Sequence, residues 1–160
     1  MEQKTKINAE DGKQDLEITR EFELPVALLF RAHAEPELLE QWMSNPYTTA
    51  KALKFEAKKH GSYHIESTDA NGKVVFRSNG TFHEFIPNKK ITRTFEMDGT
   101  PYGVQLEVYE FEQLTADTSK LRMHVIYESV AQRDQVLKLP FAQGINMAHN
   151  RIQDILSKLK

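Results

Sequence analysis

The stretch DLEITREFELPVALLFRAHAEPELLEQWMSNP, residues 15–46, changes its hydrophobic period at a proline. Four of the five alternate positions from Leu16 to Leu24 are apolar, a pattern typical of a strand with one buried face. Pro25 ends that strand, and proline is well tolerated in the first turn of a helix. The stretch therefore predicts a strand that is followed at once by a helix.

Two short helices are predicted in the rest of this stretch. The first carries a short apolar stripe through PVALLFRAH. The second lies in EPELLEQWMSNP, where one proline restarts the helix and the next one stops it. Its apolar residues recur at i, i+1, i+4 and i+5, and Trp42, the only tryptophan of the chain, is one of them. Trp42 is therefore expected to point at the sheet.

Six further strands joined by short turns are predicted up to about residue 130. Asn71-Gly72 is a strong signal for a two-residue hairpin, and Gly80 indicates a bulge or a close approach of two backbones. The strand that follows residue 103 is expected to bury its aliphatic face, from Val104 to Val108. The outer face of the sheet is then predicted to be hydrophilic, with Thr92, Thr94, Glu96, Gln105, Glu107, Arg122 and His124.

From residue 132 the apolar period becomes 3.6, which predicts one continuous helix over residues 132–160. The expected fold is α+β: a curved antiparallel sheet of about seven strands, two short helices after the first strand, and the long C-terminal helix across the concave face. Residues 1–14 are polar and are expected to form a flexible segment, whereas 15–160 are expected to form a single domain.

Composition excludes several classes of function. The 160 residues carry a formal net charge of −2, which offers no basic surface for nucleic acid or an anionic membrane. The chain has no cysteine, so disulfides and thiolate chemistry are excluded. Neither a membrane span nor a secretory h-region is visible, and a cytoplasmic protein with no membrane or nucleic-acid partner is expected.

Motifs for catalysis, cofactors and metals are missing from the sequence. The six histidines lack the spacing of metal ligands, and G-x-S-x-G and phosphate-binding glycine loops are absent. We therefore predict no catalytic residue, no cofactor and no metal site. An enzyme without a visible motif stays open, although a non-enzymatic function is favoured.

Four segments resemble, in the right order, the START-like or SRPBCC superfamily, also called the helix-grip fold. Within it the chain is similar to the branch of the C-terminal domain of the heat-shock-protein-90 ATPase activator. The segments are ITREFELPVALLFRAHAEPELLEQWMSNP, HGSYHIES, GTFHEFIPNKKITRTFEMD and FAQGINMAHNRIQDIL. Two departures are His60, where the family usually has the first glycine of a pair, and residues 43–45, where a second tryptophan and a glycine are common.

The resemblance implies a cavity between the sheet and the C-terminal helix. The superfamily uses it for apolar or aromatic ligands, in some branches for cyclase or hydrolase chemistry, and the activator branch contacts a chaperone. Trp42 is either a core residue or part of the cavity wall, and the two roles are compatible. The candidate ligand-binding residues are Trp42, Phe55, Tyr63, Phe76, Arg93, Phe95, Met97, Met123, Phe141 and Ile145.

Arg93 is unusual because strand alternation places its charge on the same face as Ile91 and Phe95. One interpretation puts the guanidinium in solvent or in an ion pair with Glu84 or Glu110. The other makes Arg93 the anchor for the carboxylate of an amphipathic ligand.

Two main functional hypotheses follow. The first is a binding protein for an apolar or amphipathic small molecule, and the alternative is a protein-interaction domain that modulates a chaperone. The first predicts an enclosed cavity, and the second predicts an apolar or charged patch on the outer face of the sheet. A cyclase-type or hydrolase-type enzyme is a third hypothesis. A monomer or a weak homodimer formed by an exposed edge strand is expected.

Overall fold

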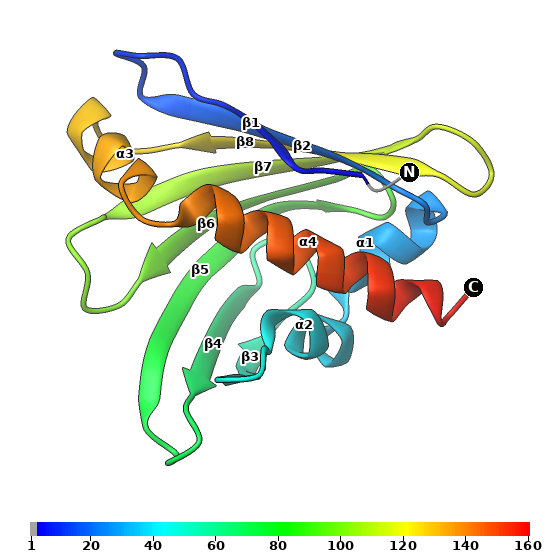
Figure 1. Ribbon diagram of the computed structural model, residues 1–160, viewed down its shortest axis with the longest axis horizontal. Helices are drawn as coiled ribbons and strands as arrows, with labels where there is room; N and C mark the ends of the chain where they lie inside the picture. The colour runs from blue at the N-terminus through cyan, green and yellow to red at the C-terminus, as the bar shows by residue number, and fades with distance from the viewer. Residues whose placement is uncertain (1–2) are drawn as a thin grey trace.

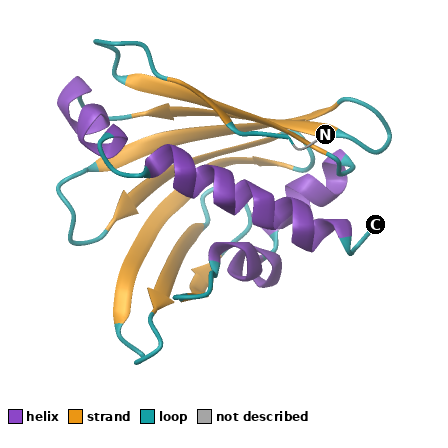
Figure 2. Ribbon diagram, in the orientation of Figure 1, coloured by secondary structure: helices purple, strands orange, loops and turns teal. Residues whose placement is uncertain are grey.

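The computed structural model describes residues 3–160 as a curved antiparallel sheet of eight strands with helices on its concave side (Figure 1, Figure 2). The strands are β1 (Lys6–Asn8), β2 (Asp15–Phe22), β3 (Thr49–Phe55), β4 (Ser62–Thr68), β5 (Val74–Ile86), β6 (Lys90–Met97), β7 (Val104–Gln113) and β8 (Ser119–Ile126). The helices are α1 (Val26–Ala34), α2 (Pro36–Met43), α3 (Val130–Leu137) and α4 (Phe141–Ser157). The strand order is β1-β2-β8-β7-β6-β5-β4-β3. The predicted α+β fold is confirmed.

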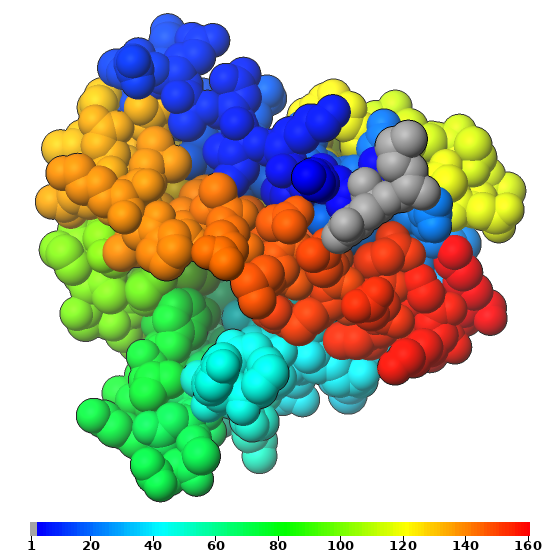
Figure 3. Space-filling view, viewed as in Figure 1, coloured from blue at the N-terminus to red at the C-terminus, as the bar shows by residue number. Residues whose placement is uncertain are grey.

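Helices α1 and α2 begin at prolines, as the sequence predicts. Pro25 immediately precedes α1, and Pro36 is the first residue of α2. Their apolar stripes pack inward, and Leu29 and Leu39 are 0% and 3% exposed. Helix α2 contacts both β3 and α4, and the space-filling view shows α2, in cyan, directly against α4 (Figure 3). This end of the concave face is therefore closed by packed helices.

The N-terminal segment adds an eighth strand that the sequence pattern did not predict. Lys6–Asn8 form β1, which pairs antiparallel with β2 at the edge of the sheet. Ile7, the one aliphatic residue in this segment, is half-buried and packs against the core. The structure thus gives these residues a strand in a segment predicted to be flexible, because β2 offers them an unpaired edge. Residues 1 and 2 lie outside the described part of the chain.

The predicted continuous helix over 132–160 is also wrong. The chain forms α3, leaves the helix at Lys138, and begins α4 after Pro140. Proline lacks an N–H group and disfavours helical geometry in the residue before it, so the break falls at this point. The break leaves Leu139, Pro140 and Phe141 as a corner between the two helices.

Strand β7 faces the opposite way from the prediction. Glu107 and Tyr109 are 5% and 6% exposed and lie on the concave face, whereas Val104 and Leu106 are 36% and 37% exposed on the convex face. The prediction fails because the concave face of β7 carries a polar network rather than a purely apolar surface. The predicted outward position of Gln105 and Glu107 is therefore corrected.

Polar side chains dock the middle of α4 on β2. Arg20, 3% exposed, donates to Asn146 Oδ1 at 3.2 Å and to Asn150 Oδ1 at 2.9 Å. His149 is 3% exposed, and its ring nitrogen Nδ1 lies 2.7 Å from the Thr5 hydroxyl. Further along α4, Ile152 and Leu156 are fully buried. The C-terminal half of α4 is thus packed against α1, α2 and the end of β2.

Candidate ligand-binding site

Two pockets open on the concave face, and they meet at Phe95. The α2 pocket has a cavity volume of about 60 Å³ and is lined by His33, Leu39, Trp42, Met43, Ile65, Ser78, Phe82, Ile91, Arg93, Phe95 and Tyr109. The α3–α4 pocket has a cavity volume of about 400 Å³ and is lined by Phe95, Met97, Tyr102, Gly103, Gln105, Glu107, Tyr127, Val136, Leu139, Pro140 and Phe141. The volume of the α3–α4 pocket is in the range of small-molecule sites, whereas that of the α2 pocket is well below it.

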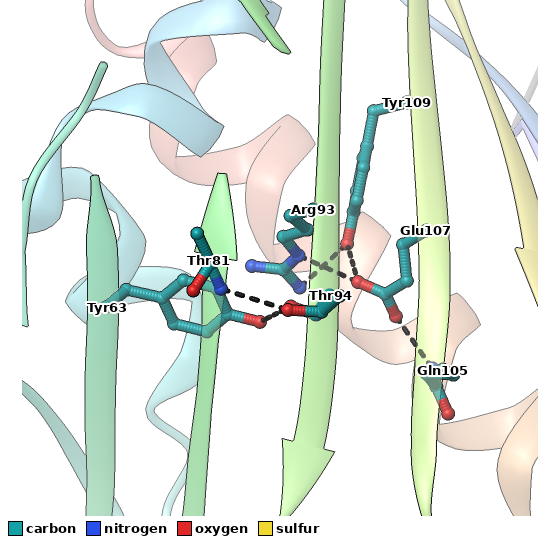
Figure 4. Close-up of polar contacts among 7 residues, drawn as sticks. All are labelled: Tyr63, Thr81, Arg93, Thr94, Gln105, Glu107 and Tyr109. Atoms are coloured by element: carbon teal, nitrogen blue, oxygen red, sulfur yellow. Dashed lines mark hydrogen bonds and ion pairs between the residues drawn. The ribbon is translucent and has the colours of Figure 1, made fainter. Parts of the chain in front are cut away.

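A buried ion pair forms the polar part of the wall between the pockets (Figure 4). Arg93 Nε donates to Glu107 Oε1 at 2.7 Å, and the two side chains are 16% and 6% exposed. Arg93 Nη2 donates to the Tyr109 hydroxyl at 2.8 Å, and that hydroxyl donates to Glu107 Oε1 at 2.9 Å. Gln105 Nε2 donates to Glu107 Oε2 at 2.7 Å. Strands β6 and β7 hold this network because Arg93 and Glu107 are directly paired across them.

The ring of Tyr63, on β4, packs against the Arg93 guanidinium. The Arg93 guanidinium lies 4.8 Å from the centre of the Tyr63 ring, a cation–π contact, and the Tyr63 hydroxyl donates to the Thr94 carbonyl at 2.6 Å. This arrangement requires Gly80, because a Cβ there would lie 1.9 Å from the Thr94 oxygen and 2.7 Å from the Tyr63 hydroxyl. The sequence-based interpretation of Gly80 as a close approach is confirmed.

Trp42 both packs and lines a pocket. Its Nε1 donates to the Ala32 carbonyl at 2.7 Å, which joins α2 to α1, and its own carbonyl accepts a hydrogen bond from Arg151 Nε of α4 at 2.8 Å. Its ring borders the α2 pocket beside His33, with ring centres 5.6 Å apart. The two roles that the sequence left open for Trp42 thus coexist.

The titratable groups of the site balance to zero net charge. Burial lowers the pKa of His33 to about 4, so its imidazole is neutral at pH 7. Burial would lower the Arg93 pKa, but the nearby Tyr109, Tyr63 and Glu107 keep it above its ordinary value. Burial raises the pKa of Tyr63 and Tyr109, which stay protonated. The arginine cation and the glutamate anion therefore cancel each other.

Each pocket contains one buried hydroxyl without a hydrogen-bond partner among the described residues. In the α2 pocket this is Ser78, 1% exposed, and in the α3–α4 pocket it is Tyr127, 2% exposed. A buried polar group without a partner costs free energy, so such groups call for an explanation.

The structure brings together several of the ten predicted site residues but not all of them. Three line the α2 pocket: Trp42, Arg93 and Phe95. Three line the α3–α4 pocket: Phe95, Met97 and Phe141. Tyr63 and Phe55 lie behind the wall and contact Phe82 through their rings. Met123 is buried in the core, Ile145 packs against the core, and the half-buried Phe76 lines neither pocket.

The partner of Arg93 was predicted wrongly. Glu107 occupies the place that Glu84 or Glu110 was expected to fill, and Glu84 instead pairs with Lys90 at 3.0 Å. Sequence reasoning also missed His33, Ser78, Glu107, Tyr109 and Tyr127 as wall residues. One signal was available, because a buried Arg93 needs a counter-charge. If Glu107 rather than Leu106 faces inward on β7, it lies directly opposite Arg93 and provides that charge.

Residues 3–160 hold neither a metal-binding cluster nor a membrane-spanning helix. In this range no group of three or more His, Asp or Glu side chains lies close enough together to hold a metal ion. None of the described helices is both long enough and apolar enough to cross a membrane.

The chain belongs to the family described as "Activator of Hsp90 ATPase homolog 1-like protein", whose model matches residues 23–157. No curated protein matches the sequence significantly. Within the family pattern, His60 takes the position where a glycine is common, and its φ of 67° lies in the left-handed region that favours glycine. The backbone at this position therefore has a conformation that glycine favours.

Solved structures share the fold at low sequence identity. A crystal structure of a protein from Mycobacterium smegmatis has a TM-score of 0.84 at 20% identity and covers 96% of each chain. A crystal structure of a protein from Rhodobacter sphaeroides has a TM-score of 0.85 at 21% identity, covering 96% of this chain and 99% of the other. A solution structure of a protein from Arthrobacter aurescens has a TM-score of 0.83 at 19% identity, covering 96% and 91%. These likenesses establish the helix-grip fold.

Proposed function

We propose that this protein binds a small apolar or amphipathic molecule in the α3–α4 pocket. The observation that carries the proposal is the lining of this pocket, which is mostly aromatic and aliphatic and contains a few polar groups from β7 and Tyr127. A concave apolar surface with a small number of polar groups is the usual form of a small-molecule site. Membership in the AHSA1-like family, whose fold encloses such a space, supports the same function.

The position of α4 supports binding at this end. Phe141 and Ile145, in the first turns of α4, are only partly buried, whereas Ile152 and Leu156 further along are 0% exposed. The helix is thus less tightly packed where it borders the pocket. A ligand in the α3–α4 pocket would complete the burial of Phe141 and Leu139.

The test is a titration with N-phenyl-1-naphthylamine, a neutral dye whose fluorescence rises in apolar surroundings. We expect saturable binding with a dissociation constant of about 10 μM or tighter. Met97→Trp fills the pocket with a larger side chain and should weaken binding at least about tenfold. The matched control is Val75→Trp, which introduces the same side chain at a β5 residue that is 51% exposed and should bind like the unmodified protein.

Two results would contradict this proposal. One is the absence of saturable binding by the unmodified, folded protein. The other is equal binding by Met97→Trp and Val75→Trp, which would show that the dye does not occupy the α3–α4 pocket.

A second candidate function is contact with a chaperone through the convex face of the sheet. The corrected phase of β7 exposes Val104 and Leu106 there, where a hydrophilic face was predicted. An exposed apolar stripe of this kind suits a protein interaction, and the family description names an activator of the Hsp90 ATPase.

This second function is tested by measuring the ATPase rate of purified Hsp90 with and without the protein. The chaperone function predicts a change in rate that Leu106→Lys abolishes, because a charge would interrupt the apolar stripe. The control Leu114→Lys introduces the same charge at another exposed leucine, 41% exposed, and should leave the effect intact. An unchanged ATPase rate with the unmodified protein would argue against this function.

A further inference from the structure

We propose that the α3–α4 pocket selects electrically neutral ligands that carry a hydroxyl group and rejects carboxylates, with Tyr127 and Glu107 as the residues that determine this specificity. The inference rests on the proposed function, and it replaces the sequence-based hypothesis that Arg93 anchors an acidic ligand.

The Arg93 cation already has partners within the protein. A ligand carboxylate would need the Arg93 guanidinium, but Glu107 already accepts from Arg93 Nε at 2.7 Å, and Tyr109 accepts from Arg93 Nη2 at 2.8 Å. The ion pair is buried, and breaking a buried pair leaves a desolvated charge without compensation. A ligand acid would thus have to displace an intramolecular acid that is held in place by three hydrogen bonds from Arg93, Tyr109 and Gln105.

Within residues 3–160, the wall of the α3–α4 pocket contains an acidic residue and no basic one. Of the described residues that line the α3–α4 pocket, Glu107 is the one with an ionisable acidic side chain, and none is Lys, Arg or His. An anionic ligand in this pocket would find no free cation, because Arg93 is already paired with Glu107, and it would lose its hydration on entry. A neutral ligand meets neither penalty.

The Tyr127 hydroxyl is a polar group of this pocket that is available to a ligand. Tyr127 follows Ile126, which pairs with Leu106, so its side chain lies beside Gln105 and Glu107 on the concave face. Its hydroxyl is buried and has no hydrogen-bond partner within residues 3–160. Burial, and then the charge of Glu107, raise the Tyr127 pKa, so the phenol keeps its proton and can donate it to a ligand oxygen.

A ligand hydroxyl has the donor and the acceptor that these two groups call for. It can accept the hydrogen bond from Tyr127 and, in turn, donate to Glu107 Oε2, which accepts one hydrogen bond from Gln105 and has a lone pair left. A ligand carbonyl could use Tyr127 alone, and a hydrocarbon could use neither group. The wall therefore ranks ligands of equal shape as alcohol or phenol first, hydrocarbon second and carboxylate last.

The experiment compares four probes of nearly equal shape by calorimetric titration at pH 7: 2-naphthol, 2-naphthamide, 2-naphthoate and naphthalene. We expect 2-naphthol to bind at least about tenfold tighter than naphthalene, and 2-naphthamide to bind at least about tenfold tighter than 2-naphthoate. The second pair differs in charge but hardly in shape, so it isolates the effect of Glu107. Equal or tighter binding of 2-naphthoate would overturn the proposal.

Tyrosine variants test the hydroxyl contact. Tyr127→Phe should reduce the affinity for 2-naphthol to that for naphthalene, while naphthalene itself binds unchanged. The matched control is Tyr102→Phe, which removes a hydroxyl from another, half-buried tyrosine of the same pocket and should keep the preference for 2-naphthol. If Tyr127→Phe keeps that preference, or if Tyr102→Phe alone loses it, the assignment of Tyr127 is wrong.

A charge variant provides an independent arm. Glu107→Gln removes the anion and leaves Arg93 without its counter-charge, so 2-naphthoate should gain at least about tenfold in affinity where the variant folds. If it does not fold, the naphthamide and naphthoate pair on the unmodified protein still decides. Failure of all four probes and of N-phenyl-1-naphthylamine would contradict the proposed function, whereas binding without the expected ranking would contradict this inference alone.

Discussion

The two halves of α4 differ in how they meet the sheet. The C-terminal half buries Ile152 and Leu156 completely and is joined to α2 through the hydrogen bond from Arg151 to the Trp42 carbonyl. The N-terminal half begins after Pro140, and its first residue, Phe141, lines the α3–α4 pocket. Figure 1 shows the same difference, with α1 and α2 beside the C-terminal half and the corner between α3 and α4 at the other end. One helix therefore serves as core at one end and as a pocket wall at the other.

This difference shows how a small domain can contain a pocket and still be stably folded. The closed end contributes apolar burial, Arg20 holds the middle of α4 through polar contacts, and the open end leaves apolar side chains partly uncovered. Between the two ends lies the buried pair of Arg93 and Glu107. The cost of desolvating the two charges is offset only when both partners are present. Removal of one partner should therefore cause the largest loss of stability.

The largest expected effect is that of Arg93→Met. The change leaves the buried Glu107 carboxylate without its cation, and removal of one partner of a buried ion pair costs about 3 to 5 kcal/mol. Denaturant unfolding should show this loss, and the double variant Arg93→Met with Glu107→Gln should recover most of it. A single variant as stable as the unmodified protein would show that the pair is not buried in solution.

The two halves of α4 can be compared directly by alanine substitution. Leu156→Ala, at a residue with 0% exposure, should lower the free energy of unfolding by about 3 kcal/mol. Phe141→Ala, at the edge of the pocket, should lower it by about 1 kcal/mol or less but should weaken dye binding at least about tenfold. The comparison fails if the larger loss of stability occurs at Phe141.

Acidification should destabilise the protein through its two buried histidines. Burial lowers the pKa of His33 to about 4 and that of His149 to about 3, below the ordinary value of 6.5. A depressed folded-state pKa of a histidine means that the unfolded chain takes up a proton first, so stability is complete above about pH 6.5 and declines below it. Each histidine should cost about 2 kcal/mol at pH 5.

The check on this prediction is denaturant unfolding at pH 7 and pH 5. His149→Phe removes one of the two groups and should flatten the pH dependence by about half. Equal stability of the unmodified protein at both pH values would show that neither imidazole is buried.

The smallest expected effect is that of Tyr127→Phe on stability. Because the Tyr127 hydroxyl is buried without a partner in the described part of the chain, its removal should leave the free energy of unfolding unchanged or raise it by up to about 1 kcal/mol. Thermal and denaturant unfolding without ligand measure this. A loss above about 1 kcal/mol would reveal a hydrogen bond that the hydroxyl makes in solution.

Much of the fold could be predicted because single residues govern it locally. The prolines at 25 and 36 start the helices, Gly80 permits the close approach of Tyr63, and the alternation of β2 sets its buried face. Two features of the fold were not predicted, also for local reasons. The apolar period runs on through Pro140 and hides the break that this proline causes, and the edge strand β1 depends on a single aliphatic residue, Ile7.

The site was harder to predict because its wall breaks the rule that apolar faces point inward. Strand β7 turns its aliphatic residues outward, and Glu107 and Tyr109 face the pockets because Arg93 needs them. Hydrophobic alternation carries no information about such a pair. The correct phase follows only from the register between β6 and β7, which places Glu107 opposite Arg93.

Intermolecular NOEs show whether a small molecule occupies the space under the corner of α3 and α4. The protein, labelled at its methyl groups, would be saturated with N-phenyl-1-naphthylamine. We expect NOEs from the dye to the methyl groups of Met97, Val136 and Leu139, which line the α3–α4 pocket. NOEs confined to Val104 and Leu106 on the convex face would contradict this expectation and would move the binding surface to the other side of the sheet.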